Sequence, residues 1–168
     1  MIALVRVDNR LVHGQVLVTW VPHVAAELLL VADEEAARNP LARAAMTLAL
    51  PPGLRASIEP PGSVRWEALA ASPERVLVVV RDVADVERAV DAGLTPQRSL
   101  AIQIGNVHFA RGRRQVTPSV FLSEEELGVL RRLVAAGFAV EARAVPHDPP
   151  LRLAEIERRW QAASGRGD

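Results

Sequence analysis

The chain has 168 residues, of which 49% are hydrophobic and 24% charged, a balance typical of one soluble globular domain rather than a disordered chain. Its formal net charge is zero, which argues against binding nucleic acid through a bulk positive field. The absence of cysteine excludes disulfides, zinc–thiolate sites, iron–sulfur clusters and cysteine nucleophiles. No apolar run approaches the roughly 18 residues of a membrane helix, and the N-terminus lacks the pattern of a secretory signal.

Short apolar runs alternate with helix patterns along the chain. The predicted strands are 2–7, 27–32, 54–59, 75–80, 99–104 and 138–145, together with a hairpin of 107–109 and 115–122 around the turn 111–113. The predicted helices are 15–21 (ended by Pro22), a pair that meets at Asn39-Pro40 between 33 and 50, 63–71, 82–92, 123–136 and 151–163. This alternation predicts an α/β fold, an open and mainly parallel sheet with helices on both faces. We expect residues 1–168 to form one domain, with 164–168 as a frayed tail.

Several predicted loops begin where strands end, at 8–15, 32–39, 81–85 and 105–109. Ligands of open α/β sheets collect beyond the carboxyl ends of the strands. If the strands are parallel, these loops share one edge of the sheet, and the first and last of them can meet in space.

The first of these loops carries the strongest chemical signal. Asp8, Arg10 and His13 follow a buried strand, and Gly14 and Gln15 can open a helix whose N-terminal amides favour an anion. An imidazole can accept a phosphoryl group near neutral pH, and a guanidinium can hold the phosphoryl oxygens. Asp8 could orient Arg10 or His13, Gly14 admits close backbone approach, and Gln15 could donate an amide hydrogen. The alternative is a histidine that caps a helix beside an Asp8–Arg10 ion pair.

A second histidine, His108, follows the fifth predicted strand and could face the same edge. Gly105 and Asn106 indicate a backbone turn there. Asn106 and His108 are candidate contacts to phosphate or to a partner, and a structural histidine in a hairpin turn is the alternative. We assign no role to His23 or His147.

Other kinds of site find little support. The four histidines lack metal-ligand spacing, so no metal site is expected, and the dinucleotide and Walker A glycine patterns are absent. Arg111, Arg113 and Arg114 form a basic cluster on the predicted turn, read as a solvated hairpin tip or as a docking patch for an acidic partner or membrane headgroups. The acidic residues 33–35 are interpreted as the start of a helix, where the helix dipole favours negative charge.

The segment from Arg6 to Gln15, Arg-Val-Asp-Asn-Arg-Leu-Val-His-Gly-Gln, resembles the signature Arg-Ile-Asp-Asp-Arg-Leu-Ile-His-Gly-Gln of the IIB components of the mannose/fructose/sorbose family of the bacterial phosphoenolpyruvate-dependent sugar phosphotransferase system. One departure is Asn9, where the family commonly has a second acid. Further segments similar to the family are Val-Ala-Asp-Glu-Glu at 31–35 followed by Asn39-Pro40, Ala-Leu-Pro-Pro-Gly at 49–53, Ile-Gly-Asn-Val-His-Phe at 104–109 and Val-Pro-His-Asp-Pro at 145–149.

The resemblance implies that His13 is a phosphohistidine modified on Nδ1 and that Arg10 stabilises the phosphate. It implies a cytoplasmic phosphotransferase, peripherally associated with the membrane, that takes phosphate from a phosphorylated IIA protein or domain. The phosphate would pass to a sugar held by membrane IIC and IID subunits, without a cofactor. A regulatory module that uses the same histidine without sugar transport is the alternative, and a homodimer through the Ala-rich helices stays open. The sugar is not readable from the chain.

Overall fold

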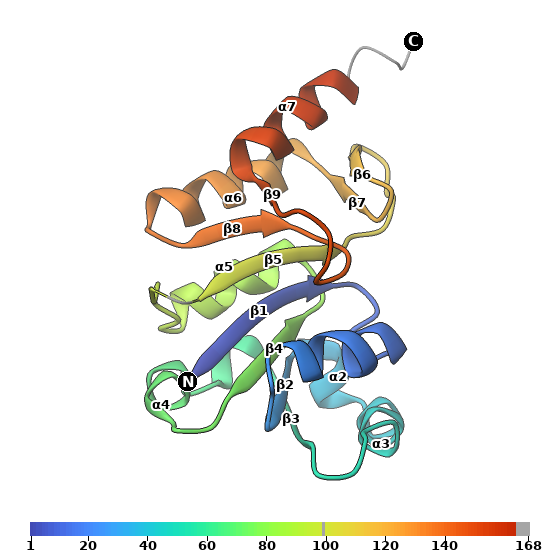
Figure 1. Cartoon of the computed structure of the whole chain (residues 1–168), viewed down its shortest axis with the longest axis vertical. Coiled ribbons are helices and arrows are strands. Elements are labelled where there is room, and N and C mark those ends of the chain that lie inside the picture. Colours follow the sequence, from blue (N-terminus) through green and yellow to red (C-terminus); the bar gives the residue numbers. More distant parts are fainter. Residues whose placement is uncertain (99, 164–168) are drawn as a thin grey trace.

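The computed structural model describes residues 1–98 and 100–163. Seven of the described strands form one sheet in the order β3-β2-β4-β1-β5-β8-β9 (Figure 1). Their bounds are Ile2–Asp8 for β1, Leu28–Ala32 for β2, Arg55–Glu59 for β3, Val76–Val80 for β4, Ala101–Asn106 for β5, Ala139–Ala142 for β8 and Leu151–Arg152 for β9. Neighbouring strands are parallel except β9, which is antiparallel to β8. The predicted α/β class and mainly parallel sheet are confirmed, and β1 lies in the centre.

Helices cover both faces of this sheet, as predicted (Figure 1). One face carries η1 (Val16–Trp20), α1 (Val21–His23), α2 (Glu34–Arg38) and α3 (Pro40–Leu48). The other carries α4 (Trp66–Ala71), α5 (Val83–Asp91) with η2 (Pro61–Ser63) packed on it, α6 (Glu124–Ala135) and α7 (Leu153–Ala163). Because successive side chains of a strand point to opposite faces, Leu4 packs in one apolar cluster while Val5 and Val7 pack in the other.

Side-chain caps start several helices where the sequence predicted them. Asp33 Oδ1 accepts a hydrogen bond from the amide of Ala36 at 2.7 Å, and Ser123 forms a capping box with Glu126. Asn39 caps α3, which begins at Pro40, so the break predicted within 33–50 is confirmed. Across the described part of the chain, no helix is long and apolar enough to cross a membrane.

Several local predictions were wrong. The backbone turn expected at Gly105 and Asn106 does not form, because both residues belong to β5 and Gly105 is not among the glycines with positive φ. Pro22 does not end the first helix, since α1 continues to His23 after a π-helical η1 in which the amide of Val21 donates to the carbonyl of Val16. The predicted pairing of 107–109 with 115–122 does not form as a hairpin. Instead β6 (Arg114–Thr117) pairs antiparallel with β7 (Val120–Leu122), and Val107 makes an isolated parallel bridge to Val120. Pro118 starts the turn between them, because its fixed φ suits a turn better than a strand.

The C-terminal third also departs in detail from the prediction. The strand expected at 138–145 stops at Ala142, and the following loop leads into β9, whose residues were predicted to start the last helix. Ser99, the expected first residue of the fifth strand, and the tail 164–168 lie outside the described residues.

Candidate functional site

Loops from four strands converge at the carboxyl edge of the sheet, as expected. The side chain of Asn9 donates to the carbonyl of Arg81 at 2.7 Å and accepts a hydrogen bond from the amide of His108. Arg81 in turn forms a two-pronged ion pair with Asp33, at 2.7 and 2.9 Å. These hydrogen bonds and this ion pair connect the loops after β1, β2, β4 and β5. The loop that carries His13 is therefore held in place by its neighbours.

The carboxylate of Asp8 is the centre of the site and is fully buried. Oδ2 accepts from Nη2 of Arg6 at 3.2 Å and lies 3.1 Å from Nε2 of His13. Arg10 donates to both carboxylate oxygens, from Nε at 3.1 Å and from Nη2 at 3.2 Å. Asp8 was expected to orient either Arg10 or His13, and its carboxylate contacts both side chains.

The ring of His13 is held through one nitrogen. Its Nε2 faces Asp8, and no described residue hydrogen-bonds to Nδ1. The side chain is 17% exposed, so it is reachable from solvent while one side packs on protein. A carboxylate at Nε2 favours the tautomer with the proton on that nitrogen, which leaves the lone pair on Nδ1.

Burial and charge together set the protonation states of the site. Burial lowers the pKa of His13 and outweighs the opposing effect of Asp8, while the charges of Arg10 and Arg6 lower it further. Burial alone would raise the pKa of Asp8, but the hydrogen bond from Arg10, the charge of Arg6 and the bond to His13 lower it below its usual range. At neutral pH the site therefore holds an ionised carboxylate beside a neutral imidazole.

A strained turn carries the chain from β1 to the helix. The amide of Leu11 donates to the carbonyl of Asp8 at 2.9 Å, and Leu11 adopts a φ of 54°, in the left-handed region that side-chain-bearing residues rarely occupy. Its side chain is only 2% exposed, and this burial holds the strained backbone in place. Helical structure then begins at Gly14, and the carbonyl of His13 accepts from the amide of Leu17 at 3.1 Å.

The other predicted contacts lie near this loop in different ways. Gln15 accepts from Nη2 of Arg10 at 3.1 Å, and Gly14 is exposed at the start of the helix. Asn106 is the register partner of Asp8 on β5, and its Nδ2 is buried without a hydrogen-bond partner among the described residues. His108 is exposed, and its carbonyl accepts from Arg113.

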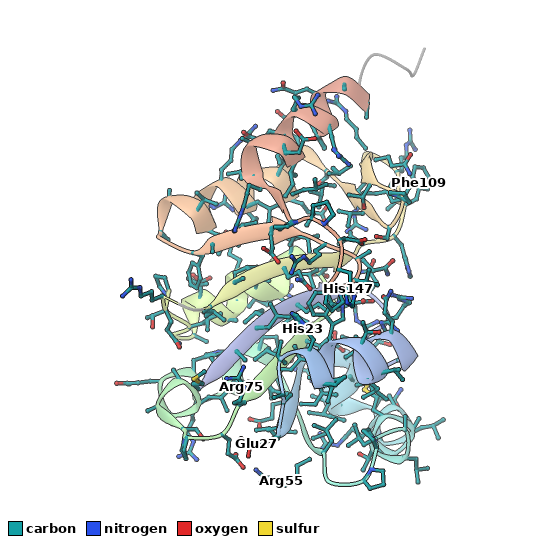
Figure 2. All side chains as sticks on the ribbon, in the orientation of Figure 1. His23, Glu27, Arg55, Arg75, Phe109 and His147 are labelled. Carbon is teal, nitrogen blue, oxygen red and sulfur yellow. The ribbon has the colours of Figure 1, made fainter. Side chains whose placement is uncertain are left out.

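The remaining sequence candidates lie in other surroundings. His23 packs edge-on against Trp20, His147 stands in the loop between β8 and β9, and Phe109 lies beside the β6–β7 hairpin (Figure 2). Arg113 forms an ion pair with Glu126 and Arg114 lies over the ring of Trp160, so the predicted solvated arginine tip is wrong for these two residues. Both partners, Glu126 and Trp160, lie far from these arginines in the sequence, so local patterns did not indicate the contacts.

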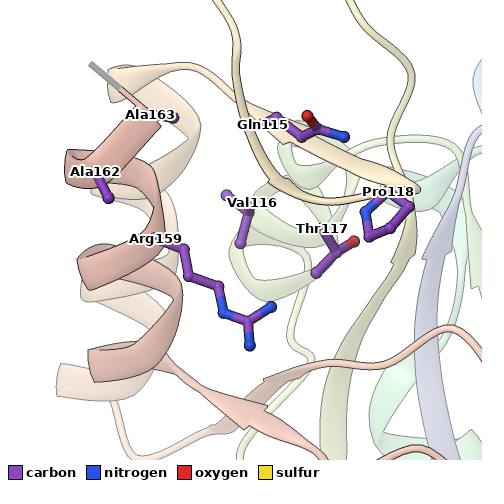
Figure 3. Close-up of a pocket in the computed structure, with 7 residues that line it drawn as sticks. All are labelled: Gln115, Val116, Thr117, Pro118, Arg159, Ala162 and Ala163. Atoms are coloured by element: carbon purple, nitrogen blue, oxygen red, sulfur yellow. The ribbon is translucent and has the colours of Figure 1, made fainter. Parts of the chain in front are cut away.

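A cavity of about 510 Å³ lies between β6 and α7 (Figure 3). Its charged lining residue, Arg159, donates from Nε to Glu155 at 2.8 Å. None of the residues lining it belongs to the loop from Asp8 to Gln15, so this cavity is separate from the candidate site.

Comparison with known proteins gives one consistent answer. Residues 2–163 match the family model described as PTS system sorbose subfamily IIB component, where PTS denotes the phosphotransferase system. The N-acetylgalactosamine-specific phosphotransferase enzyme IIB component 2 of Escherichia coli is 31% identical over 164 residues, covering 92% of this chain and 98% of that protein. The mannose-specific EIIAB component of the same species is 29% identical over 157 residues. That alignment covers 92% of this chain and 48% of the relative, so the chain spans about half the length of the mannose-specific relative.

Solved structures agree with the sequence matches. The IIBSor domain of the sorbose permease from Klebsiella pneumoniae superposes with a TM-score of 0.81 at 25% identity, covering 94% of this chain and 97% of that one. The N-acetylgalactosamine-specific IIB component 1 from Escherichia coli gives a TM-score of 0.80 at 28% identity, covering 90% and 99%. By family match, relatives and fold, this chain belongs to the sorbose subfamily of PTS IIB components.

Proposed function

We propose that this chain is a phosphoryl carrier in which His13 accepts a phosphoryl group from a phosphorylated histidine of a IIA protein or domain. The observation that carries the proposal is the hydrogen bond of 3.1 Å between Nε2 of His13 and Oδ2 of Asp8. It fixes one nitrogen of the ring on a buried anion and leaves the other, Nδ1, as the nucleophile.

The transfer follows from this arrangement. The lone pair of Nδ1 attacks the phosphorus in line with the phosphorus–nitrogen bond of the donor, which breaks and returns its electron pair to the donor imidazole. The phosphorylated ring keeps its proton on Nε2 and carries a positive charge. Asp8 stabilises that charge, because its own low pKa keeps the carboxylate ionised.

Arg10 is proposed to hold the transferring phosphoryl group. Its side chain is 42% exposed, and Asp8 and Gln15 already occupy Nε and Nη2, which turns the guanidinium into a fixed cation at the edge of the loop. The amides of Gly14 and Gln15, in the first helical turn, lack intrahelical acceptors and can add hydrogen bonds to the phosphoryl oxygens. Charge held in advance at the site lowers the cost of forming the transition state.

The acceptor is proposed to be a sugar bound by membrane IIC and IID subunits. The chain is proposed to lie in the cytoplasm and to associate peripherally with those subunits. The names of the relatives support this assignment, since they are mannose-specific, N-acetylgalactosamine-specific and fructose-specific components. Asn106 and His108 stand at the same edge and are proposed contacts to the phosphoryl group or to a docked partner.

The test is phosphorylation of the purified chain by radiolabelled phosphoenolpyruvate, enzyme I, the phosphocarrier protein and a cognate IIA protein. We expect acid-labile, base-stable label on the parent and none on His13→Ala. His23→Ala and His147→Ala are the matched controls, since each removes a histidine from outside the Asp8 network, and both should label like the parent. Label on His13→Ala equal to that on the parent would end the proposal.

A second arm separates transport from regulation. The phosphorylated chain is mixed with membranes that contain the IIC and IID subunits and a labelled sugar, and sugar phosphate is measured. Loss of label from the chain with matching gain of sugar phosphate supports transport. Stable label on the chain, with no sugar phosphate formed, favours the regulatory alternative.

A further inference from the structure

Arg6 is a charged residue in the middle of the central strand, and its guanidinium is completely buried. Its terminal nitrogens donate to Oε1 of Gln103 at 2.6 Å, to Oδ2 of Asp8 at 3.2 Å, and to the carbonyls of Arg143 and Ala144. The same guanidinium lies over the ring of Trp20, 4.9 Å from its centre. Arg6 therefore joins the strand, the helix after His13 and the loop after β8.

The neighbouring strand is adapted to this side chain. A Cβ at Gly105 would overlap the guanidinium carbon and both terminal nitrogens of Arg6, so glycine is the residue that leaves room for them. Trp20 donates from Nε1 to the carbonyl of Ala144, which also accepts from Arg6. The position of the guanidinium is thus fixed from several sides.

Stability alone does not account for a cation at this position. Desolvating a guanidinium is costly, and apolar side chains of similar volume often replace buried ion pairs without loss of stability. Nε of Arg6 is buried without a hydrogen-bond partner among the described residues, which adds to that cost. What the arginine provides here is a fixed fork and a permanent charge directly behind the Asp8 carboxylate.

We infer that Arg6 is a positioning residue for phosphoryl transfer, which holds the carboxylate of Asp8 in the orientation that fixes Nε2 of His13 and leaves Nδ1 to react. The inference rests on the proposed function, and Arg6 acts through Asp8 without touching the phosphoryl group. Since Asp8 bonds both cations and the imidazole, a tilted carboxylate would lose the geometry of Arg10 and His13 together.

The positive charge of Arg6, like its position, favours a neutral His13 ring with a lone pair on Nδ1. The charged groups that act on His13 are Asp8, Arg10 and Arg6. An Asp8 carboxylate with fewer cations around it would hold a proton on the imidazole more strongly, and a protonated ring has no lone pair for attack. Burial lowers the pKa of Arg6 to about 10, so the guanidinium stays charged at neutral pH.

The test compares Arg6→Met, Arg6→Lys and the parent by nitrogen NMR of the His13 ring and by the rate of phosphoryl transfer from a phosphorylated IIA protein. In Arg6→Met, the lost positive charge should raise the pKa of His13. The tilted Asp8 carboxylate should reduce the share of neutral rings protonated on Nε2, and transfer should be slower by roughly 10- to 100-fold. Arg6→Lys keeps the charge without the fork, so the pKa should stay near that of the parent while only part of the rate returns.

Two further variants keep the result interpretable. Gly105→Ala displaces the guanidinium with its charge intact, and it should reproduce the tautomer change and the slower transfer even if Arg6→Met does not fold. Leu130→Ala, in the core on α6, destabilises the fold elsewhere and should leave the pKa and tautomer of His13 unchanged. A purely structural role for Arg6 predicts that its variants behave like Leu130→Ala.

The inference is overturned if Arg6→Met, or Gly105→Ala where Arg6→Met does not fold, keeps the parental His13 pKa, tautomer and transfer rate. A parent that accepts no phosphoryl group at His13 would instead contradict the proposed function. The NMR readings on the unphosphorylated chain would then still decide whether Arg6 positions Asp8 and His13.

Discussion

Oδ2 of Asp8 lies 3.1 Å from Nε2 of His13, so a buried carboxylate and a partly exposed imidazole share a hydrogen bond across the turn after β1. The two residues meet because the strained turn at Leu11 reverses the chain between them. In the proposed function, this contact assigns different tasks to the two ring nitrogens: Nε2 holds the ring in place and Nδ1 reacts.

Removing the charge of Asp8 should affect both stability and activity. Asp8→Asn leaves Arg6 buried without its anion, and breaking a buried ion pair in this way costs about 3 kcal/mol of unfolding free energy. Phosphoryl transfer should slow strongly, because the cationic phosphorylated ring loses its counter-charge. Urea denaturation and labelling kinetics measure the two effects, and a variant as stable and as fast as the parent would contradict the account.

Arg10→Ala should separate activity from stability. The side chain is 42% exposed, so its ion pair with Asp8 contributes at most about 1 kcal/mol to folding, while its loss removes the proposed clamp on the phosphoryl group. Transfer should become much slower with little change in thermal stability. Arg38→Ala, which removes an exposed arginine paired with Glu34, is the matched control and should transfer normally. Normal kinetics in Arg10→Ala would remove this residue from the site.

The transfer rate should depend on the protonation of His13. Because its pKa lies below the value of about 6.5 for a free imidazole, more than half of the rings are neutral at that pH. The rate should therefore stay high at pH 6.5 and fall only as pH drops through the lowered pKa. Asp8 remains ionised throughout, since its pKa lies below its usual range. Transfer rates between about pH 5 and pH 8 test this, and a midpoint above pH 6.5 would contradict it.

Asn9→Ala should weaken the contacts that hold the loop of His13 against the loops after β4 and β5. The variant loses the bonds from Asn9 to the carbonyl of Arg81 and from the amide of His108, worth about 2 kcal/mol together. Hydrogen exchange at the His108 amide should speed up, and transfer should slow. Ser123→Ala removes a helix cap worth about 1 kcal/mol, and it should leave that amide and the transfer rate unchanged. Equal effects of the two variants would show that Asn9 contributes only general stability.

Much of the fold was readable because local signals agreed with tertiary structure. The apolar run in β4 and the capping box at Ser123 each indicated one element, and each element forms. Pro22 misled because a π-helical turn precedes it and the helix continues through it, and periodicity does not report a widened turn. The β6–β7 pairing was missed because the turn was placed at 111–113 and residues 115–122 were taken as one strand, although Pro118 interrupts them.

The contacts among the candidate residues of the first loop were predictable from the sequence, but their contacts with distant residues were not. Asp8, Arg10 and His13 lie within one loop, so sequence proximity alone brought them together. Arg6 received no role from the sequence, since its partners Gln103 and Ala144 lie about a hundred residues or more away. A charged residue in a central apolar strand, two positions before an acid, is the signal that could have identified it.

The most direct test of the account identifies the phosphorylated atom. The chain is phosphorylated by a phosphorylated IIA protein and examined at alkaline pH by correlated nitrogen and phosphorus NMR of the His13 ring. The account predicts one phosphorus–nitrogen bond, at Nδ1, with the proton retained on Nε2. Phosphorus on Nε2, the nitrogen that faces Asp8, or on another residue would contradict it.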